Sequence, residues 1–351
     1  MSTANEFSLD SFLSDVVDGG NGVNFDPIGD TAEDGQVSPA YFEPGYEGTI
    51  DPRIRQLSYS SLLSLHSCPR KFQLSRLRTT HRSEELLKST ITFSFGHVVG
   101  EGIQLVLEGK SEEEVIWRMF LGWHTPNLFD ADEKDKKDFW SAVIAIQRFI
   151  AMREGGFLND YELVHYNGKP ACELSFAVSF PGGFRLRGFV DAVLRHKITG
   201  AIIVLECKTT GATTLNPATY KNSAQAIGYS VVLDVLFPEL SSYDVLYLIY
   251  QTKSREYSVI PFTKTYLQRA LWIRELLLDI EMIKLYAEAE VFPMHGESCV
   301  AFGRDCEYLQ SCGLSTSYLT KPCTEADLDK TEYQINLTLT DLLDAQLEKT
   351  S

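Results

Sequence analysis

The chain has 351 residues, of which 44% are hydrophobic, and a formal net charge of −16. This length and apolar content suit one elaborated globular domain or two small ones. There is no run of eighteen apolar residues, which argues against a membrane span, and the odd count of seven cysteines does not suggest a disulfide framework, so we expect a soluble protein of the reducing cytoplasm.

The negative charge is concentrated at the two ends of the chain. Residues 1–50 contain ten Asp and Glu and no Lys or Arg, residues 324–351 contain seven acidic and two basic residues, and 31 acidic and 30 basic residues remain for 51–323. We therefore predict a disordered acidic tail over 1–50, a nearly neutral folded body over 51–323 and a second acidic tail over 324–351. The tails either solubilise the protein or recruit a replication or recombination protein.

The body begins with a predicted helix over 58–77, which contains the sequence SYSSLLSLHSCPRKFQL. Arg70 and Lys71 lie in this helix, and further basic residues follow it. Such cations can neutralise phosphates of a nucleic acid and make its binding depend on salt, although a run of charges is equally often a solvated face. Arg70 and Lys71 are therefore candidate nucleic-acid contacts.

The rest of the body alternates between helical and strand patterns. The pattern predicts helical regions over 96–122 and 134–154 (a helical insert of about 96–155), strands over 173–180, 184–197 and 201–209, a helix that begins after Pro217, strands over 244–251 and 257–262, and a helix over 263–290. This order predicts an α/β fold in which helices flank a sheet, with a core of about 170–262.

Asp191, Glu206 and Lys208 lie in GFVDAVLRHKITGAIIVLECKTTG, which reads as two strands joined by a short turn. Because strand side chains alternate, Glu206 and Lys208 face one side and Cys207 the other, so only the backbone carbonyl of Cys207 could reach a metal bound there. Two carboxylates that hold Mg²⁺ or Mn²⁺ beside an ammonium suit the hydrolysis of a phosphodiester bond. The alternative is an ordinary surface hairpin with a salt bridge.

Two further positions add polar groups near this trio. Gln225 and Tyr229 are four residues apart and share one face of the helix after Pro217, from which they could bind a nucleic-acid backbone or hold Lys208 in place. A solvated Gln and a core Tyr are the alternative. Glu173, at the start of a strand, either touches a water on the metal or merely flanks the strand.

Taken together, these motifs resemble the PD-(D/E)XK nucleases, and within them the RecB-type and CRISPR-associated exonucleases with their phage relatives. The motifs between roughly Leu57 and Cys312 are the opening helix, FGHVVGEGIQ from Phe95, Glu173, the trio of Asp191, Glu206 and Lys208, and the helix motif from Gln225 to Tyr229. The resemblance implies a restriction-endonuclease-like core with a mixed central sheet, and a metal-dependent exonuclease that acts on single-stranded or duplex DNA ends.

The second motif departs from the family at one position. Many RecB-type domains carry a metal-ligating His four residues after the glycine of this motif, and that position, counted from Gly96, is Gly100 here. His97 follows the glycine directly and lies about one helical turn from Gly100 on the same face. His97 is therefore a candidate metal ligand in a shifted register, with a second layer of contacts or simple packing as the alternatives.

Four cysteines form a separate candidate site. Cys299, Cys306 and Cys312 lie in an irregular stretch over 299–312, and with Cys68 they would give a four-Cys site for an iron–sulfur cluster or zinc. The resemblance implies a [4Fe-4S] cluster with one Cys before the core and three after it, although six residues separate Cys299 from Cys306 where relatives usually have two. Buried or idle thiols are the alternative.

The sequence as a whole predicts a Mg²⁺- or Mn²⁺-dependent deoxyribonuclease of DNA replication, recombination or repair. Asp191 and Glu206 would hold the metal, Lys208 would assist the attacking water, and Gln225 and Tyr229 would position the DNA. The first alternative is a catalytically silent DNA-binding or scaffold module of a replication or recombination complex. A zinc-stapled interaction protein without a nucleic-acid role is a further alternative.

Overall fold

The computed structural model describes residues 50–77, 91–124, 129, 131–221, 223–240, 242–301, 304–321, 323–328 and 331–348. Its helices are α2 (Tyr59–Ser67), α3 (Pro69–Leu77), α4 (Ile91–Leu107), α5 (Glu112–Gly122), α6 (Phe139–Glu154), α7 (Ala218–Lys221), α8 (Ala224–Leu236), α9 (Tyr266–Glu288), α10 (Thr316–Leu319) and α11 (Leu339–Glu348). None of the helices in this described part is long and apolar enough to cross a membrane. The predicted tail over 1–50 lies outside the described residues apart from Ile50.

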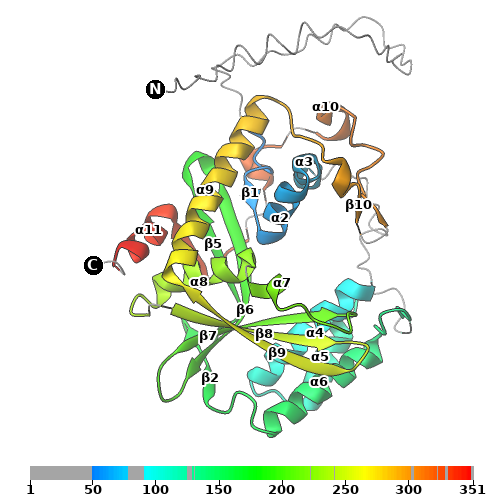
Figure 1. Cartoon of the computed structure of the whole chain (residues 1–351), viewed down its shortest axis with the longest axis vertical. Coiled ribbons are helices and arrows are strands. Elements are labelled where there is room, and N and C mark those ends of the chain that lie inside the picture. The colour runs from blue at the N-terminus through cyan, green and yellow to red at the C-terminus, as the bar shows by residue number, and fades with distance from the viewer. Residues whose placement is uncertain are drawn as a thin grey trace, which may run out of the picture. The chain divides into compact units, whose positions relative to one another are not determined.

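A mixed sheet organises the fold (Figure 1). The strands are β1 (Gln56–Leu57), β2 (Tyr161–Leu163), β3 (His165–Tyr166), β4 (Lys169–Pro170), β5 (Cys172–Ser179), β6 (Arg185–His196), β7 (Ile202–Thr210), β8 (Ser242–Gln251), β9 (Glu256–Thr265), β10 (Val300–Ala301), β11 (Arg304–Asp305) and β12 (Ile335–Thr338). The sheet order is β12-β5-β6-β7-β8-β9, and β1 and β2 also pair with β6. The β12–β5 and β7–β8 pairs are parallel and the others along this order are antiparallel. The α/β fold class, a mixed sheet flanked by helices, is confirmed.

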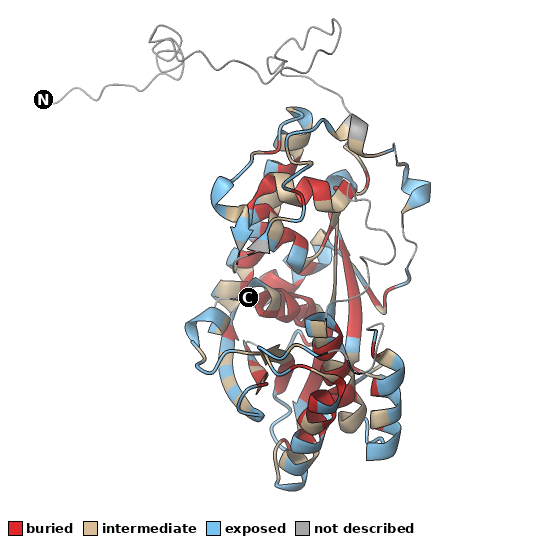
Figure 2. Cartoon of the chain, turned by 90° about the vertical axis from the view of Figure 1, so that its right-hand side faces the viewer, coloured by how far each residue is buried: buried red, intermediate tan, exposed pale blue. Residues whose placement is uncertain are grey.

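The helices cover the two faces of the sheet and give each face its own apolar core. Val204 of β7 packs in the core that includes α8 and α9, whereas its neighbour Leu205 packs in the core that includes α4, α5 and α6. This alternation follows from the two-residue period of a strand. Figure 1 shows the two groups of helices on opposite sides of the strands, and Figure 2 shows the buried residues concentrated along the strands and the inner helix faces.

The helix predicted over 58–77 is two helices. Ser58 caps the first one, because its side chain accepts a hydrogen bond from the backbone N of Ser61. The first helix ends at Cys68, whose backbone is extended with φ −160° and ψ 106°. Proline disfavours the helical conformation in the residue that precedes it, here Cys68. Pro69 itself then starts the second helix. The prediction missed this corner, which turns α3 away from α2.

The helix predicted to begin after Pro217 also starts later than expected. α7 is a single short turn, and α8, which carries Gln225 and Tyr229, begins at Ala224. Tyr220 of α7 packs its ring against Tyr247 of β8, with centroids 5.0 Å apart. This contact anchors α7 to the sheet separately from α8.

The C-terminal segment differs from the predicted acidic tail. β12 adds a strand to the edge of the sheet beside β5, and α11 packs against α8. Ile335 and Leu342 are buried at 2% and 1% exposure. The charge count hid this element because its buried apolar residues are interleaved with the exposed acidic residues Glu332, Asp341 and Asp344. Residues 335–348 therefore belong to the folded body.

Candidate active site

The β6–β7 hairpin brings Asp191 and Glu206 to one side of the sheet, as the sequence predicted. Val193 and Val204 are paired across the hairpin and both pack in the core with α8. Glu206 lies two residues from Val204 and so faces the same side, and the charge of Glu206 acts on the Asp191 carboxyl, whose pKa it raises. The backbone N of Cys207 donates to Asp191 Oδ2 at 2.9 Å, which ties the carboxylate to the neighbouring strand.

An irregularity in the sheet lies at this point. The Leu174–Val190 pair packs on the α8 side, but the next pair, Cys172–Ala192, packs on the α4 side. In a regular ladder, pairs two residues apart face the same side. One residue lies between these pairs on each strand, Glu173 on β5 and Asp191 on β6, and the side that the pairs face changes there. Glu173 has a left-handed backbone with a φ of 45°. Backbone strain of this kind is often found at functional sites.

Lys208 contacts Glu206 and is held by the predicted helix motif. Its Nζ lies 2.5 Å from Glu206 Oε1 and donates to Gln225 Oε1 at 3.2 Å. Gln225 Nε2 in turn donates to Tyr229 Oη at 2.5 Å. The structure therefore brings together Asp191, Glu206, Lys208, Gln225 and Tyr229. The Lys208 side chain is 38% exposed, so a substrate can reach it, whereas that of Glu206 is 1% exposed.

The two carboxyl groups have the electrostatics of a cation-binding site. Burial raises the pKa of Asp191 well above its ordinary value, and the charge of Glu206 raises it further. Burial also raises the pKa of Glu206, although the charge of Lys208 opposes the rise. For Lys208, burial lowers the pKa, but attraction to Glu206 and Asp191 outweighs it and the net shift is upward. Lys208 is therefore an ammonium at neutral pH.

Glu206 leaves room for a further positive partner. Apart from the ion pair with Lys208, neither of its buried oxygens has a hydrogen-bond donor among the described residues. A buried carboxylate without donors is costly unless a cation joins it. The hard oxygens of Asp191 and Glu206 fit Mg²⁺ or Mn²⁺, which is often bound through only one or two carboxylates and keeps several waters. Within the described ranges, no group of three His, Cys, Asp or Glu residues is arranged to hold a metal.

His97 lies on α4 with its ring exposed. It stacks between Phe93 at a centroid distance of 6.3 Å and His124 at 5.7 Å. A role as a metal ligand stays a prediction for this residue. Gln104, further along the same helix, donates its Nε2 to Glu173 Oε1 at 3.0 Å.

Gln104 and Tyr59 are site residues that the sequence analysis did not single out. Tyr59 begins α2, and its ring packs edge-on against Tyr229 with centroids 5.4 Å apart. Tyr59 lies within the motif SYSSLL and Gln104 within FGHVVGEGIQ. The spacing of Gln104 four residues after Gly100 was the available signal, because it places both on one helix face.

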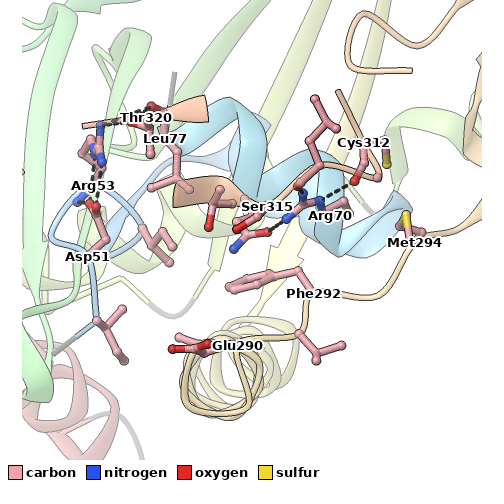
Figure 3. Close-up of a pocket in the computed structure, with 18 of the residues that line it drawn as sticks. Asp51, Arg53, Arg70, Leu77, Glu290, Phe292, Met294, Cys312, Ser315 and Thr320 are labelled. Atoms are coloured by element: carbon pink, nitrogen blue, oxygen red, sulfur yellow. Dashed lines mark hydrogen bonds and ion pairs between the residues drawn. The ribbon is translucent and has the colours of Figure 1, made fainter. Parts of the chain in front are cut away.

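Arg70 and Lys71, the candidate nucleic-acid contacts, have different surroundings. The guanidinium of Arg70 donates to Cys312 O at 2.9 Å, to Gln73 Oε1 at 2.5 Å and to Leu314 O. Arg70 lines a cavity to which Cys312 and Leu314 also contribute, and Figure 3 shows it reaching from α3 toward Cys312. Arg70 thus ties α3 to the Cys-rich segment, while Lys71 lines the adjacent cavity of the cysteines. Their contact with nucleic acid stays a prediction.

The four predicted cysteines come from distant parts of the chain and line one small cavity. Cys68 lies at the corner between α2 and α3, and Cys299, Cys306 and Cys312 follow α9. All four are free thiols in this structure. The four cysteines therefore line one cavity, but no three of them are arranged to hold a metal among the described residues, and the cluster stays a prediction.

Comparison with known proteins gives a family match and distant structural likenesses. Residues 56–313 match the family model described as the PD-(D/E)XK nuclease superfamily. The crystal structure of SSO0001 is similar at 14% identity, over 65% of this chain and 76% of that chain, with a TM-score of 0.28. A crystal structure of a candidate exonuclease from Eubacterium rectale is similar at 14% identity, over 80% of this chain and 95% of that chain, with a TM-score of 0.43. No curated protein matches the chain.

Proposed function

Because the chain belongs to the PD-(D/E)XK nuclease superfamily, whose model matches residues 56–313, we propose that it is a metal-dependent deoxyribonuclease. We place it with the RecB-type and CRISPR-associated branch and its phage relatives, as an exonuclease of DNA replication, recombination or repair. The observation that carries the proposal is Glu206, a buried carboxylate that lacks hydrogen-bond donors in the described part of the chain and contacts Lys208.

Asp191 and Glu206, with the carbonyl of Cys207, would hold Mg²⁺ or Mn²⁺, and His97 is a predicted further ligand. When bound, the cation supplies Lewis-acid stabilisation of the negative charge that develops on the phosphate. It also offsets the repulsion between two buried carboxylates, which otherwise raises the pKa of Asp191.

Lys208 acts as a fixed positive charge in this proposal. The attraction of Glu206 and Asp191 raises its pKa and favours the ammonium form, which would orient the attacking water and stabilise charge in the transition state. Gln225 accepts from Lys208 and is held by Tyr229. This chain of contacts limits the positions that the ammonium can take, which is the basis of catalysis by preorganised charge.

The test is cleavage of end-labelled single- and double-stranded DNA in Mg²⁺, Mn²⁺ or EDTA. We expect metal-dependent products whose rate falls at least about 100-fold in Lys208→Ala, because the fixed charge is lost. Lys284→Ala, which removes a half-exposed ion pair with Glu281 on α9, is the matched control and should cleave normally. An exonuclease shortens labelled ends stepwise, and the ladder gives the polarity.

A silent DNA-binding or scaffold module is the alternative function. The contacts of Lys208 argue against it, because a catalytically inactive site would have no functional reason to keep an ammonium beside a buried carboxylate. If the unmodified protein cleaves no DNA in any metal yet still retains it, this alternative replaces the nuclease. Partners recruited through the acidic tail over 1–50 would then be the next question.

We also propose that Cys68, Cys299, Cys306 and Cys312 hold a [4Fe-4S] cluster, with zinc as the alternative. The shared cavity supports this, because cysteines from the corner between α2 and α3 and from the segment after α9 line one space, and soft sulfur ligands suit an iron–sulfur cluster or zinc. Anaerobically purified protein should contain iron and sulfide and absorb visible light, and Cys68→Ser should lose both. Cys323→Ser is the control. A colourless protein that contains zinc would assign the site to zinc.

A further inference from the structure

Three aromatic rings form an exposed stack beside the candidate active site. Phe93 and His97 are one turn apart on α4, with ring planes 6° apart, and His124, which follows α5, stacks on His97 at 27°. Phe93 is 63% exposed, and both histidines are exposed. We call Phe93, His97 and His124 the ring stack. At this exposure, a large part of the Phe93 ring is accessible to a ligand.

The ring stack lies on a face of α4 that leads to the carboxylates. Gln104 binds Glu173, and a Cβ at Gly96 would lie 3.5 Å from Oγ1 of Thr209, the residue after Lys208. Between these two contacts, a Cβ at Gly100 would meet no atom of the described residues within 4 Å. His97, Gly100 and Gln104 share one helix face, and His97 is about 10 Å along the axis from Gln104. Gly100, which no other described residue crowds, therefore lies between the stack and the acidic groups.

We propose that the ring stack binds the unpaired bases of a single-stranded DNA end whose phosphodiester enters the site. This inference rests on the proposed nuclease function and names its substrate class. Every base has a flat face that stacks on an aromatic or imidazole ring, so such a contact is strong but tolerant of sequence. Bases within a duplex are already stacked on one another, so the ring stack favours single strands over duplex.

Another exposed aromatic group supplies a control. Trp117 and Phe120 of α5 stack at 5.7 Å, and Trp140 of α6 joins them through Phe139. Trp140 is 56% exposed, which is close to the exposure of Phe93. The contacts of α4 with Thr209 and Glu173 connect the ring stack, and not Trp140, to the active site.

The test measures binding without cleavage. Fluorescent single-stranded DNA and a blunt duplex of the same sequence are titrated in EDTA at several salt concentrations, with Phe93→Ala, Phe93→Leu, His97→Ala and Trp140→Ala. We expect the three ring-stack variants to weaken single-strand binding about tenfold or more. Duplex binding and the salt dependence should not change, because loss of stacking releases no counterions. Trp140→Ala should bind like the unmodified protein.

A further variant separates stacking from metal binding at His97. His97→Phe keeps a flat ring and should restore the single-strand affinity that His97→Ala loses. Failure of His97→Phe to restore binding would overturn the stacking role of His97. The whole proposal is refuted if Phe93→Ala leaves single-strand affinity intact or weakens duplex binding equally. Since no metal is present, inactivity in the cleavage assay would refute the nuclease without altering these binding results.

Discussion

At the scale of single residues, the site combines groups that are unfavourable alone and useful together. Asp191 and Glu206 are buried carboxyl groups with raised pKa values, and burial is the largest cause for each. Glu173 adopts a left-handed backbone that costs a non-glycine residue on the order of 1 kcal/mol or more. Such unfavourable groups persist in a fold where a ligand or a reaction offsets their free-energy cost. The proposed divalent cation would do so here.

The first prediction concerns pH and Asp191. A carboxyl group whose pKa is raised in the folded state binds more protons there than in the unfolded chain. The free energy of unfolding therefore falls as the pH rises. The fall begins at about pH 4, the ordinary carboxyl pKa, and ends once the raised pKa is passed. In EDTA, Asp191→Asn should weaken this decline and raise the melting temperature at neutral pH. Mg²⁺ or Mn²⁺ should stabilise the unmodified protein but not the variant.

Thermal unfolding between pH 4 and 8, with and without metal, checks this prediction. Asp244→Asn is the control, because its carboxylate is exposed on β8, where it accepts a hydrogen bond from Thr263. A melting temperature of Asp191→Asn that is lower than that of the unmodified protein in EDTA at neutral pH would show that the carboxylate is not under strain.

At the scale of elements, the position of α8 depends on a close contact with α2. The ring of Tyr59 fits between α8 and the sheet, against Phe176 of β5 and Trp272 of α9. It can do so because position 228 of α8 is glycine: a Cβ there would lie 2.3 Å from Tyr59 Oη. Since α8 carries Gln225 and Tyr229, this packing also sets where the predicted substrate contacts lie.

The second prediction tests this contact. Gly228→Ala should destabilise the protein by about 1–3 kcal/mol through overpacking and lower activity, because α8 must shift. Tyr59→Phe should be nearly neutral for stability, as the Tyr59 hydroxyl has no hydrogen-bond partner among the described residues. The double variant should recover part of the loss, which urea unfolding of the four proteins measures as a coupling energy.

Gly100→Ala is the matched control for that experiment. It adds the same methyl group to a helix but meets no other described residue within 4 Å, so it should stabilise the protein by up to about 1 kcal/mol. If Gly228→Ala behaves like Gly100→Ala, α2 and α8 are not closely packed in solution.

At the scale of the whole molecule, a buried polar network joins the C-terminal helix to the sheet layer. Asp234 of α8 accepts from Arg269 Nε of α9 at 2.6 Å and from Gln346 Nε2 of α11 at 2.7 Å. Asp234 and Arg269 are completely buried. Three helices therefore meet at one carboxylate, and α11 is part of the structure that holds α8 in place.

The third prediction follows from the burial of this pair. Asp234→Ala should cost about 3–5 kcal/mol, because it leaves the Arg269 charge buried without its carboxylate, and hydrogen exchange should increase in α11. Urea unfolding checks the stability. Asp244→Ala, which removes an exposed carboxylate, should change stability by no more than about 0.5 kcal/mol. An equally small effect of Asp234→Ala would mean that the network contributes no stability.

The sequence by itself determined the elements and most of the local chemistry. Strand alternation placed Glu206 and Lys208 on one face, helical spacing placed Gln225 and Tyr229 together, and the motifs identified the superfamily. These inferences succeeded because they depend on periods of two and 3.6 residues, which short stretches of sequence contain. The same periods missed the corner at Cys68 and the folded segment over 335–348. Proline geometry produces the corner, and long-range strand pairing produces the folded segment.

Only the tertiary structure decided which groups meet. Several features of the site join residues that are far apart in the chain. They are the reversal of the sheet at Glu173 and Asp191, the contact of Gln104 with Glu173, the insertion of Tyr59 beside Gly228 and the shared cavity of four cysteines. Such contacts depend on how the packed layers lie across one another, which no local period encodes. Burial, and with it the raised pKa of both carboxyl groups, is likewise a property of the assembled layers and not of the residues themselves.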